Sequence, residues 1–188
     1  MRTRSPLTTR PLTTRVLLIC AAIGVATGFV GAVAGWLTPV VIIGTAGVAY
    51  GLVLGSHVLA GIIAQELLRT PFVALLAHLI AALVASAFNP AWALRFLGTA
   101  LLFGLIQEGV AALTRYRAWG AWRFFVSAAI IGIMIAAVVG FVVPLEELAP
   151  WARVLYIVLS ILGPIAWTAV GLAIGAALRR AGVARVPR

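Results

Sequence analysis

The sequence contains no lysine and no aspartate, and glutamate supplies all 4 of its acidic residues. Without lysine the chain cannot form the phosphate-binding loop of ATPases, which needs a lysine beside the nucleotide phosphates. The single cysteine, Cys20, excludes an internal disulfide bond and a cysteine-rich metal site. The sequence also lacks His-Glu-x-x-His and paired carboxylates within an apolar run, so a metal hydrolase has no recognisable ligands. We therefore expect no catalytic residue, metal site or cofactor in this chain.

Apolar residues dominate what is present: 64% of the chain is hydrophobic, only 10% is charged, and the mean hydropathy is +1.18. No water-soluble domain of 188 residues buries so many apolar side chains. The composition predicts an all-α polytopic membrane protein, because helices satisfy their own backbone groups in lipid. Six apolar runs of roughly the length of a span are expected to form one bundle, at about 16–37, 39–65, 71–88, 92–114, 121–143 and 151–178. Prolines such as Pro39 and Pro71 mark the boundaries, because proline cannot donate within a helix.

The 14 arginines are distributed unevenly along this pattern. With the N-terminus inside, only Arg95 and Arg153 fall on the outer side, which satisfies the positive-inside rule. Six spans then leave both termini in the cytoplasm. The expected organisation is a basic cytoplasmic tail over 1–15, a six-helix transmembrane domain over 16–180 and a cytoplasmic tail over 181–188. The first run exceeds the ~7–15 residues of a signal peptide's apolar part, so we expect it to be retained.

The formal net charge of +10 does not indicate a nucleic-acid partner. The arginines lie in short clusters between apolar runs, which is typical of topology signals rather than of a groove that follows phosphates. Membrane lipid is the expected surrounding of the chain.

Glu108 is the only acid within an apolar run rather than at its edge. An ionisable group in hydrocarbon costs roughly 2.5–3.5 kcal/mol on insertion scales, so such a residue faces the protein interior. Its carboxylate could contact a ligand, carry a proton, or pair with His78 or Arg123 as a structural partner. His78 is expected near mid-depth on a face of small residues, as either a packed polar side chain or the wall of a cavity.

Other residues also leave alternatives open. His57 follows Gly55, near which the second run is long enough to tilt or break. This histidine is either a hydrogen-bonded structural residue or a ligand contact. The first run places small residues four positions apart, as in Ala22-x-x-x-Ala26. Such residues form either internal packing or a docking face for another membrane subunit.

Aromatic side chains within the runs are candidates for stacking on a ring-shaped ligand. Trp92 and Trp151 are predicted at the outer ends of runs, where an interfacial aromatic belt is the ordinary explanation. Trp167 lies well within the last run and is the better candidate, and Tyr156 lies in the same run.

The middle of the chain carries a set of recognisable segments. They are Leu59-Ala-Gly-Ile-Ile-Ala, Arg69-Thr-Pro71, Ala-Leu-Leu-Ala-His78-Leu-Ile-Ala-Ala-Leu-Val, Asn89-Pro-Ala-Trp92, Gly104-Leu-Ile-Gln-Glu108 and Arg115-Tyr-Arg-Ala-Trp119. Over roughly residues 50–135 the chain resembles the YkoE family, which are substrate-binding S components of energy-coupling factor (ECF) vitamin transporters. The Gln-Glu pair followed by Arg-Tyr-Arg-x-Trp is the most specific part of the resemblance.

The resemblance implies a subunit of the bacterial cell membrane that captures thiamine or its hydroxymethylpyrimidine precursor from outside. Its partners would be a transmembrane coupling subunit and two cytoplasmic ATPases, which use the ATP, and the chain itself would not be an enzyme. S components generally meet the coupling subunit through small residues of the first helix, and Ala22 and Ala26 match that pattern. Where the family is expected to have a glutamate, this chain has His78. A neutral histidine supplies no negative charge, so Glu108 remains for that role.

The resulting hypothesis for the site assigns two kinds of contact to the ligand, polar and aromatic. Glu108, Gln107 and His78 would bind the polar edge of a heteroaromatic ligand. The side chains that would stack on its ring are Trp92, Trp151, Tyr156 or Trp167.

Two other classes of function remain open. An integral membrane enzyme acting on a lipid or isoprenoid would need acids or histidines near an interface, and Glu66 with Arg69 is the only hint of them. A non-binding accessory subunit would use Glu108 only to hold helices together through an ion pair.

Overall fold

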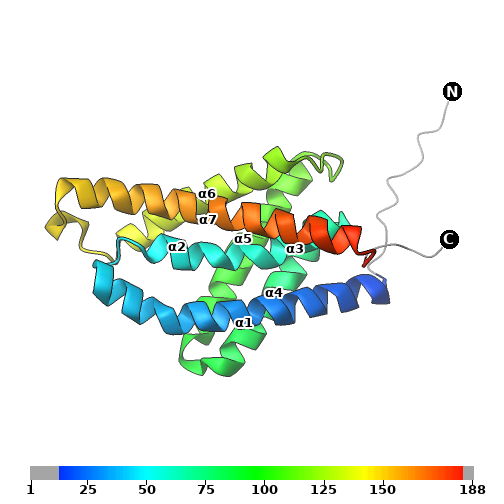
Figure 1. Cartoon of the computed structure of the whole chain (residues 1–188), viewed down its shortest axis with the longest axis horizontal. Helices are drawn as coiled ribbons and strands as arrows, with labels where there is room; N and C mark the ends of the chain where they lie inside the picture. Colours follow the sequence, from blue (N-terminus) through cyan, green and yellow to red (C-terminus); the bar gives the residue numbers. More distant parts are fainter. Residues whose placement is uncertain (1–12, 184–188) are drawn as a thin grey trace.

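The computed structural model describes residues 13–183, and all regular elements in that range are helices (Figure 1). They are α1 (Thr14–Thr45), α2 (Tyr50–Gly55), η1 (Ser56–Val58), α3 (Leu59–Leu68), α4 (Val73–Phe88), η2 (Pro90–Trp92), α5 (Ala93–Leu113), α6 (Ala121–Gly140), η3 (Leu145–Glu147) and α7 (Pro150–Arg180). The predicted all-α architecture is confirmed for this range. The tails expected over 1–15 and 181–188 fall mostly outside the described residues, and the division into domains stays a prediction.

The first helix is longer than the sequence predicts. The side chain of Thr13 accepts a hydrogen bond from the Val16 amide and caps the start of α1. The helix then continues through Pro39 to Thr45, so the boundary expected at Pro39 is wrong. Apolar residues follow Pro39, and in a membrane a helix is favoured over a break that would expose backbone groups. The helix ends where Ala46 adopts a left-handed conformation with φ of 48° and its amide bonds to Ile42.

The second span is broken at the place that the sequence indicates. α2 ends at Gly55, one turn of 3₁₀ helix follows, and α3 continues the segment to Leu68. Two glycines let this segment touch α7 closely, because a β-carbon at Gly55 would lie 2.7 Å from the backbone of Gly163, and one at Gly51 would overlap Ser160. The tight contact with α7 places His57, in η1, at a fixed point within the bundle.

Five helical segments are long and apolar enough to cross a membrane, namely α1, α2–α3, η2–α5, α6 and α7. The third predicted span, α4, has 16 residues and is about 24 Å long, which is less than a hydrocarbon core of about 30 Å. This helix packs against α1 on one side and α5 on the other. The six predicted runs therefore correspond to six helical segments, one of which is shorter than a full span.

Small residues of α1 separate into two faces. A β-carbon at Gly24 would lie 2.7 Å from Cβ of Ile80, and one at Gly28 would lie 2.6 Å from Cβ of Val84, so these glycines permit the close packing of α1 on α4. Ala22 lies on a different, exposed face of the same helix. Internal packing is thus confirmed for the glycines, whereas a docking role for the exposed alanine stays a prediction.

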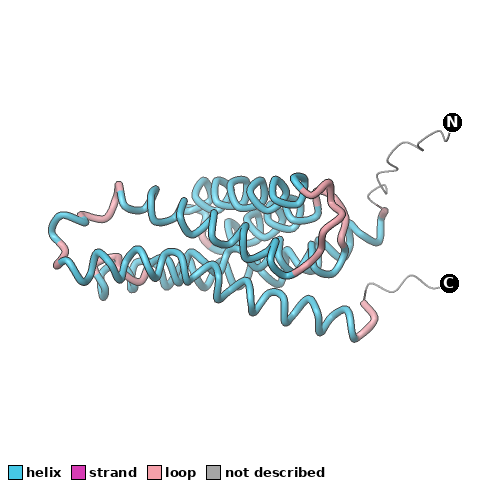
Figure 2. Tube along the Cα trace, turned by 90° about the horizontal axis from the view of Figure 1, so that it is seen from above, coloured by secondary structure: helices cyan, strands magenta, loops and turns pink. Residues whose placement is uncertain are grey.

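Both ends of the described chain lie at one end of the bundle, as Figures 1 and 2 show. Arg15 near the start of α1 donates a hydrogen bond to the carbonyl of Val183 just after α7, at 3.1 Å. A chain that passes through a membrane an even number of times has its two ends on the same side, and this arrangement agrees with that expectation. The cytoplasmic location of that end stays a prediction from the arginine distribution.

Candidate functional site

A small cavity lies where α1, η1, α4 and α5 meet. Small side chains, two histidines, one aromatic ring and three hydroxyl groups form its wall: Thr27, Gly31, Ser56, His57, Ala60, His78, Ala81, Ala82, Ala85, Phe96, Thr99 and Ala100. Its free volume is about 20 Å³, the space of roughly one water molecule. Both histidines of the chain border this cavity, and its wall contains no acidic side chain.

A second hollow of about 20 Å³ adjoins the first and continues it toward η2. Its wall consists of Gly35, Thr38, Tyr50, Leu54, His57, Trp92, Arg95, Phe96 and Thr99. His57, Phe96 and Thr99 border both hollows. The buried ring of Phe96 stacks on His57, with 6.0 Å between the ring centroids and 16° between the planes. This stacked pair therefore stands between the two spaces.

The end of the second hollow lies on the side that the arginine distribution predicts to be outside. There the guanidinium of Arg95 lies 4.7 Å from the centroid of the Trp92 ring, in a cation–π contact. Trp92 is thus a residue of this wall, as well as a residue at the end of a predicted span.

The sequence left two alternatives for His78, a packed polar side chain or the wall of a cavity, and the structure shows both. This histidine is buried and packed, and it also borders the first cavity. Its Nε2 lies 3.0 Å from Oε1 of Gln107, whose Nε2 donates to the carbonyl of Val58 at 3.2 Å. Gln107 is not part of either wall. The structure places it behind His78 rather than beside the free space.

His57 has a different environment. Its Nδ1 is buried and makes no hydrogen bond of good geometry to the described residues, although the backbone of Val53 and Leu54 lies close to the ring. An unpaired buried nitrogen is uncommon in folded proteins and calls for an explanation. Because His57 borders both hollows, a bound molecule is one source of the missing partner.

Glu108 lies outside both cavities, and its carboxylate is fully engaged with the protein. The backbone amides of Phe72 and Ala74 donate to it at 3.0 and 2.8 Å, and Gln65 Nε2 and the Tyr116 hydroxyl donate at 3.2 and 3.1 Å. A carboxylate that accepts from amides at the start of a helix also interacts favourably with the helix dipole. We call this group of five residues the Glu108 hub.

The partners expected for Glu108, His78 and Arg123, have other contacts. The Arg123 guanidinium is buried between aromatic rings, 4.3 Å from the centroid of Trp119 and 4.5 Å from that of Phe124. Tyr116 lies in the turn after α5, where burial and then the neighbouring carboxylate of Glu108 raise its pKa to about 12. Its hydroxyl therefore stays a donor to Glu108 throughout the ordinary pH range.

The remaining aromatic candidates lie away from the cavities. Trp167 donates its indole N–H to the carbonyl of Leu52 at 2.8 Å, and buried Tyr156 donates to the carbonyl of Ala136 at 2.8 Å. Trp151 is 70% exposed at the start of α7. The structure brings His78 and Trp92 to the two adjoining hollows and places these three aromatic residues elsewhere.

Phe96, Arg95 and Tyr50 border the cavities and were not singled out from the sequence. A usable signal did exist for His57, because the chain has only 2 histidines and both are predicted inside spans. Phe96 gave no such signal, since one phenylalanine among many in apolar runs is expected to be core.

An apolar groove of about 350 Å³ runs along the exposed side of α1, where α3 and α7 approach it. Its wall is Ile19, Ala22, Ile23, Ala26, Thr27, Ile63, Leu67, Ile174, Leu178 and Val183. Ala22 and Ala26, the residues expected to dock another subunit, both border this groove. The small methyl side chains of these two alanines keep this part of the surface apolar and leave room for close approach of another helix.

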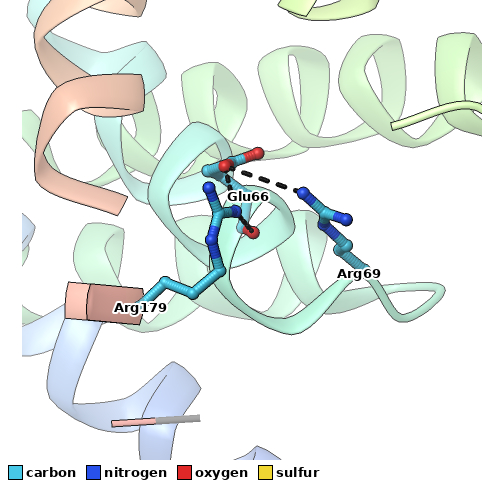
Figure 3. A network of polar contacts seen from close by, with 3 residues as sticks. All are labelled: Glu66, Arg69 and Arg179. Carbon is cyan, nitrogen blue, oxygen red and sulfur yellow. Dashed lines mark hydrogen bonds and ion pairs between the residues drawn. The ribbon is translucent and has the colours of Figure 1, made fainter. Parts of the chain in front are cut away.

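Glu66 and Arg69, the hint of an enzymatic site, form part of an ion-pair cluster at the end of α3 (Figure 3). Arg179 of α7 donates to the Glu66 carboxylate, and Arg69 lies 3.9 Å from the same oxygen. Within residues 13–183, no group of three or more histidine, cysteine or acidic side chains comes together as a metal site. The cluster joins α3 to α7 near the ends of the chain.

The sequence of this chain also matches a model of a known protein family. Residues 15–134 match the family described as ABC-type cobalt transport system, permease component. The chain belongs to this family. With its apolar helices, this membership makes the chain a membrane protein and a component of a transport system.

The fold of this chain is also similar to that of another protein in a crystal structure. A structure described as that of an S-component of an ECF transporter superimposes with a TM-score of 0.80, at 20% sequence identity, over 91% of this chain and 87% of the other. Among curated proteins none matches the chain. The S-component fold expected from the YkoE resemblance is therefore confirmed, whereas the ligand is not identified by either comparison.

Proposed function

We propose that this chain is the substrate-binding membrane subunit of an ECF-type importer. The observation that supports this proposal most strongly is the pair of adjoining hollows, bordered by His57 and His78, in a helical bundle with the fold of an S component. The family description as a permease component of an ABC-type system supports the same role. The chain would bind its ligand without changing it chemically, and ATP would be used by partner subunits.

For the ligand we propose the uncharged hydroxymethylpyrimidine in preference to thiamine. The walls of both hollows lack a carboxylate, and the carboxylate of Glu108 is already engaged by four donors. A cationic thiazolium would thus have no counter-charge at the site, and burying an unpaired charge is costly. An aminopyrimidine needs only hydrogen-bond partners and an aromatic surface, which His57, His78 and Phe96 supply.

Binding requires the hollows to enlarge, because each has room for about one water molecule and small-molecule sites occupy roughly 300–1,000 Å³. Phe96 separates the two spaces and stacks on His57. Rotation of its ring would join the hollows and free the face of His57 for the ring of the ligand. Trp92 and Arg95 border the route from the side predicted to be outside.

Cobalt is the second candidate ligand. The family description names cobalt, and two imidazole rings border one cavity. Imidazole is a good ligand for divalent transition metals. Against this, the described residues bring no third histidine, cysteine or acid to the two rings, so the observations favour an organic ligand.

For the partners we propose a transmembrane coupling subunit that docks on the α1 groove at Ala22 and Ala26, together with two cytoplasmic ATPases. The groove is apolar, lies along a lipid-facing helix and exposes small residues, which allow close approach of another helix. The proposed location is the bacterial cell membrane.

The test is a thermal-unfolding series on the purified full-length chain in detergent, with hydroxymethylpyrimidine, thiamine and Co²⁺ added separately. A ligand at 100 times its Kd stabilises the folded state by about 2.7 kcal/mol. We expect hydroxymethylpyrimidine to raise the unfolding temperature of the unchanged chain and of the exposed control Trp151→Phe. Stabilisation by Co²⁺ alone would support the second candidate, and the absence of stabilisation by all three would contradict the proposed function.

A further inference from the structure

The orientation of the Gln107 amide is fixed by its contact with the backbone. Its Nε2 lies 3.2 Å from the carbonyl oxygen of Val58, which can only accept a hydrogen bond. The amide nitrogen must therefore face Val58, and the amide oxygen must face His78. Gln107 is buried, so exchange of these bonds for bonds to water is not available.

This orientation determines which nitrogen of His78 carries the proton. Oε1 of Gln107 is an acceptor only, and Nε2 of His78 lies 3.0 Å from it. The Nε2 must therefore carry hydrogen and donate. No acidic side chain contacts His78 in the described part of the chain, and an unpaired buried charge is unfavourable. The ring is thus neutral, and its Nδ1 has a free lone pair.

Two glycines show which edge of His78 faces the cavity. Gly61 lies so close to the Gln107–His78 bond that a β-carbon there would overlap Oε1 of Gln107 and lie 2.7 Å from Nε2 of His78. A β-carbon at Gly104 would lie 3.5 Å from Cδ2 of His78. The Nε2–Cδ2 edge is therefore packed against protein. Because His78 borders the cavity, the opposite edge, with Nδ1, is left for the free space.

We infer that Gln107 is a positioning residue that sets the tautomer of His78, so that the site presents a hydrogen-bond acceptor to its ligand. The ligand class selected in this way is a planar molecule with an N–H donor, such as an exocyclic amino group. A molecule of the same shape that offers only an acceptor would place two lone pairs against each other. The part of this inference that concerns the ligand rests on the proposed function. The tautomer of His78 follows from the contacts of Gln107 alone.

The tautomer is measured by long-range ¹H–¹⁵N correlation spectra of the full-length chain in lipid nanodiscs, labelled with ring-¹⁵N histidine. The chain has only 2 histidines, and their signals are assigned with His57→Phe. We expect Nε2 of His78 to be the protonated nitrogen and Nδ1 to be unprotonated. A proton on Nδ1 in the unchanged chain would overturn the inference without any variant of Gln107.

The positioning role is tested with Gln107→Met, which keeps an unbranched side chain but removes the amide. We expect both tautomers of His78 in this variant. The matched control is Gln65→Met, because Gln65 is a buried amide on the neighbouring helix that bonds to Glu108 and to the Gln107 carbonyl, not to the His78 ring. The control should keep the Nε2–H form. An unchanged tautomer in Gln107→Met would contradict the inference.

The ligand class is tested by calorimetric binding of hydroxymethylpyrimidine and of its analogue with a methyl group in place of the amino group. We expect the unchanged chain and Gln65→Met to prefer the amino compound at least tenfold, and Gln107→Met to lose most of that preference. Equal preference in Gln107→Met and in the unchanged chain would overturn the role of Gln107. If neither compound binds, the proposed function fails, and the spectra alone decide the positioning role.

Discussion

The Glu108 hub and the histidine cavity both consist of buried polar groups in one apolar bundle, but their hydrogen bonding differs. In the hub, the carboxylate of Glu108 is bonded by two backbone amides, Gln65 and Tyr116. In the cavity, the buried Nδ1 of His57 makes no hydrogen bond within the described chain, and His78 is bonded to protein through its Nε2 alone among the hydrogen bonds of the described residues. Buried polar groups are normally paired. The comparison indicates that the hub serves the fold and that the cavity is available to a ligand.

The largest expected effect is on the hub. Glu108→Ala removes the acceptor of four donors, two buried and two partly buried, and leaving such donors unpaired costs on the order of 3 kcal/mol or more. We expect a large loss in the free energy of unfolding, measured by denaturant titration in detergent. The exposed acid Glu146 gives the control Glu146→Ala, which should change little. A Glu108 variant of normal stability that has lost only ligand binding would show that the hub is part of the site.

The ion-pair cluster between α3 and α7 should have a smaller effect. Arg179→Ala removes the partner of Glu66, but the Arg179 side chain is 44% exposed, so water screens the pair. We expect a loss of about 1 kcal/mol that becomes smaller at high salt. The exposed neighbour Arg180 provides the control Arg180→Ala. An equal loss in both variants would mean that the pair with Glu66 is not what joins these helices.

Tyr116→Phe removes one of the four donors to Glu108 and should cost about 0.5–1 kcal/mol. The pKa of Tyr116 is raised from 10.0 to about 12 in the folded state. Its contribution to stability is therefore complete below pH 10 and is lost as the pH rises from 10 to about 12, because the unfolded state releases the proton first. Unfolding titrations across this window should show a steeper decline for the unchanged chain than for Tyr116→Phe. Parallel curves would contradict the proposed pKa shift.

The smallest effect on stability is expected in the cavity. His57→Phe keeps a ring that can stack on Phe96 and removes a buried nitrogen that has no partner. The free energy of unfolding should be unchanged or increase by up to about 1 kcal/mol, while binding of hydroxymethylpyrimidine falls at least tenfold. Denaturant titration and calorimetry on the same sample measure the two quantities. If His57→Phe were destabilised and bound the ligand normally, His57 would serve the fold rather than the ligand, contrary to the role assigned here to the cavity.

Much of the fold could be predicted from the sequence, because the membrane requires long apolar helices and these are visible as runs. The six apolar runs predicted the number of helical segments, and Gly55 predicted the place of the break in the second one. The end of the first helix was wrong, since Pro39 is accommodated within α1 and the helix ends at Thr45. A proline in a membrane helix is a weaker stop signal than one in water.

The site was harder to predict. Glu108 is conspicuous because a carboxylate in an apolar run is unusual, but two of its four donors are backbone amides at the start of α4, which the sequence does not bring next to α5. Backbone amides are present in every sequence, so the sequence does not show which of them will donate hydrogen bonds to a buried carboxylate. His78 was identified with its two roles left open. Phe96 is one of several phenylalanines in apolar runs and looks like an ordinary core residue in the sequence. Its position between the two hollows is recognisable only from the structure.

The most direct test of the central claim is a structure of the full-length chain with bound hydroxymethylpyrimidine, determined by crystallography or by electron microscopy in nanodiscs. The account predicts the pyrimidine between His57 and His78, with its amino group facing Nδ1 of His78 and the Phe96 ring displaced from its position on His57. A pyrimidine bound at the Glu108 carboxylate, with the His57–Phe96 stack intact, would contradict it.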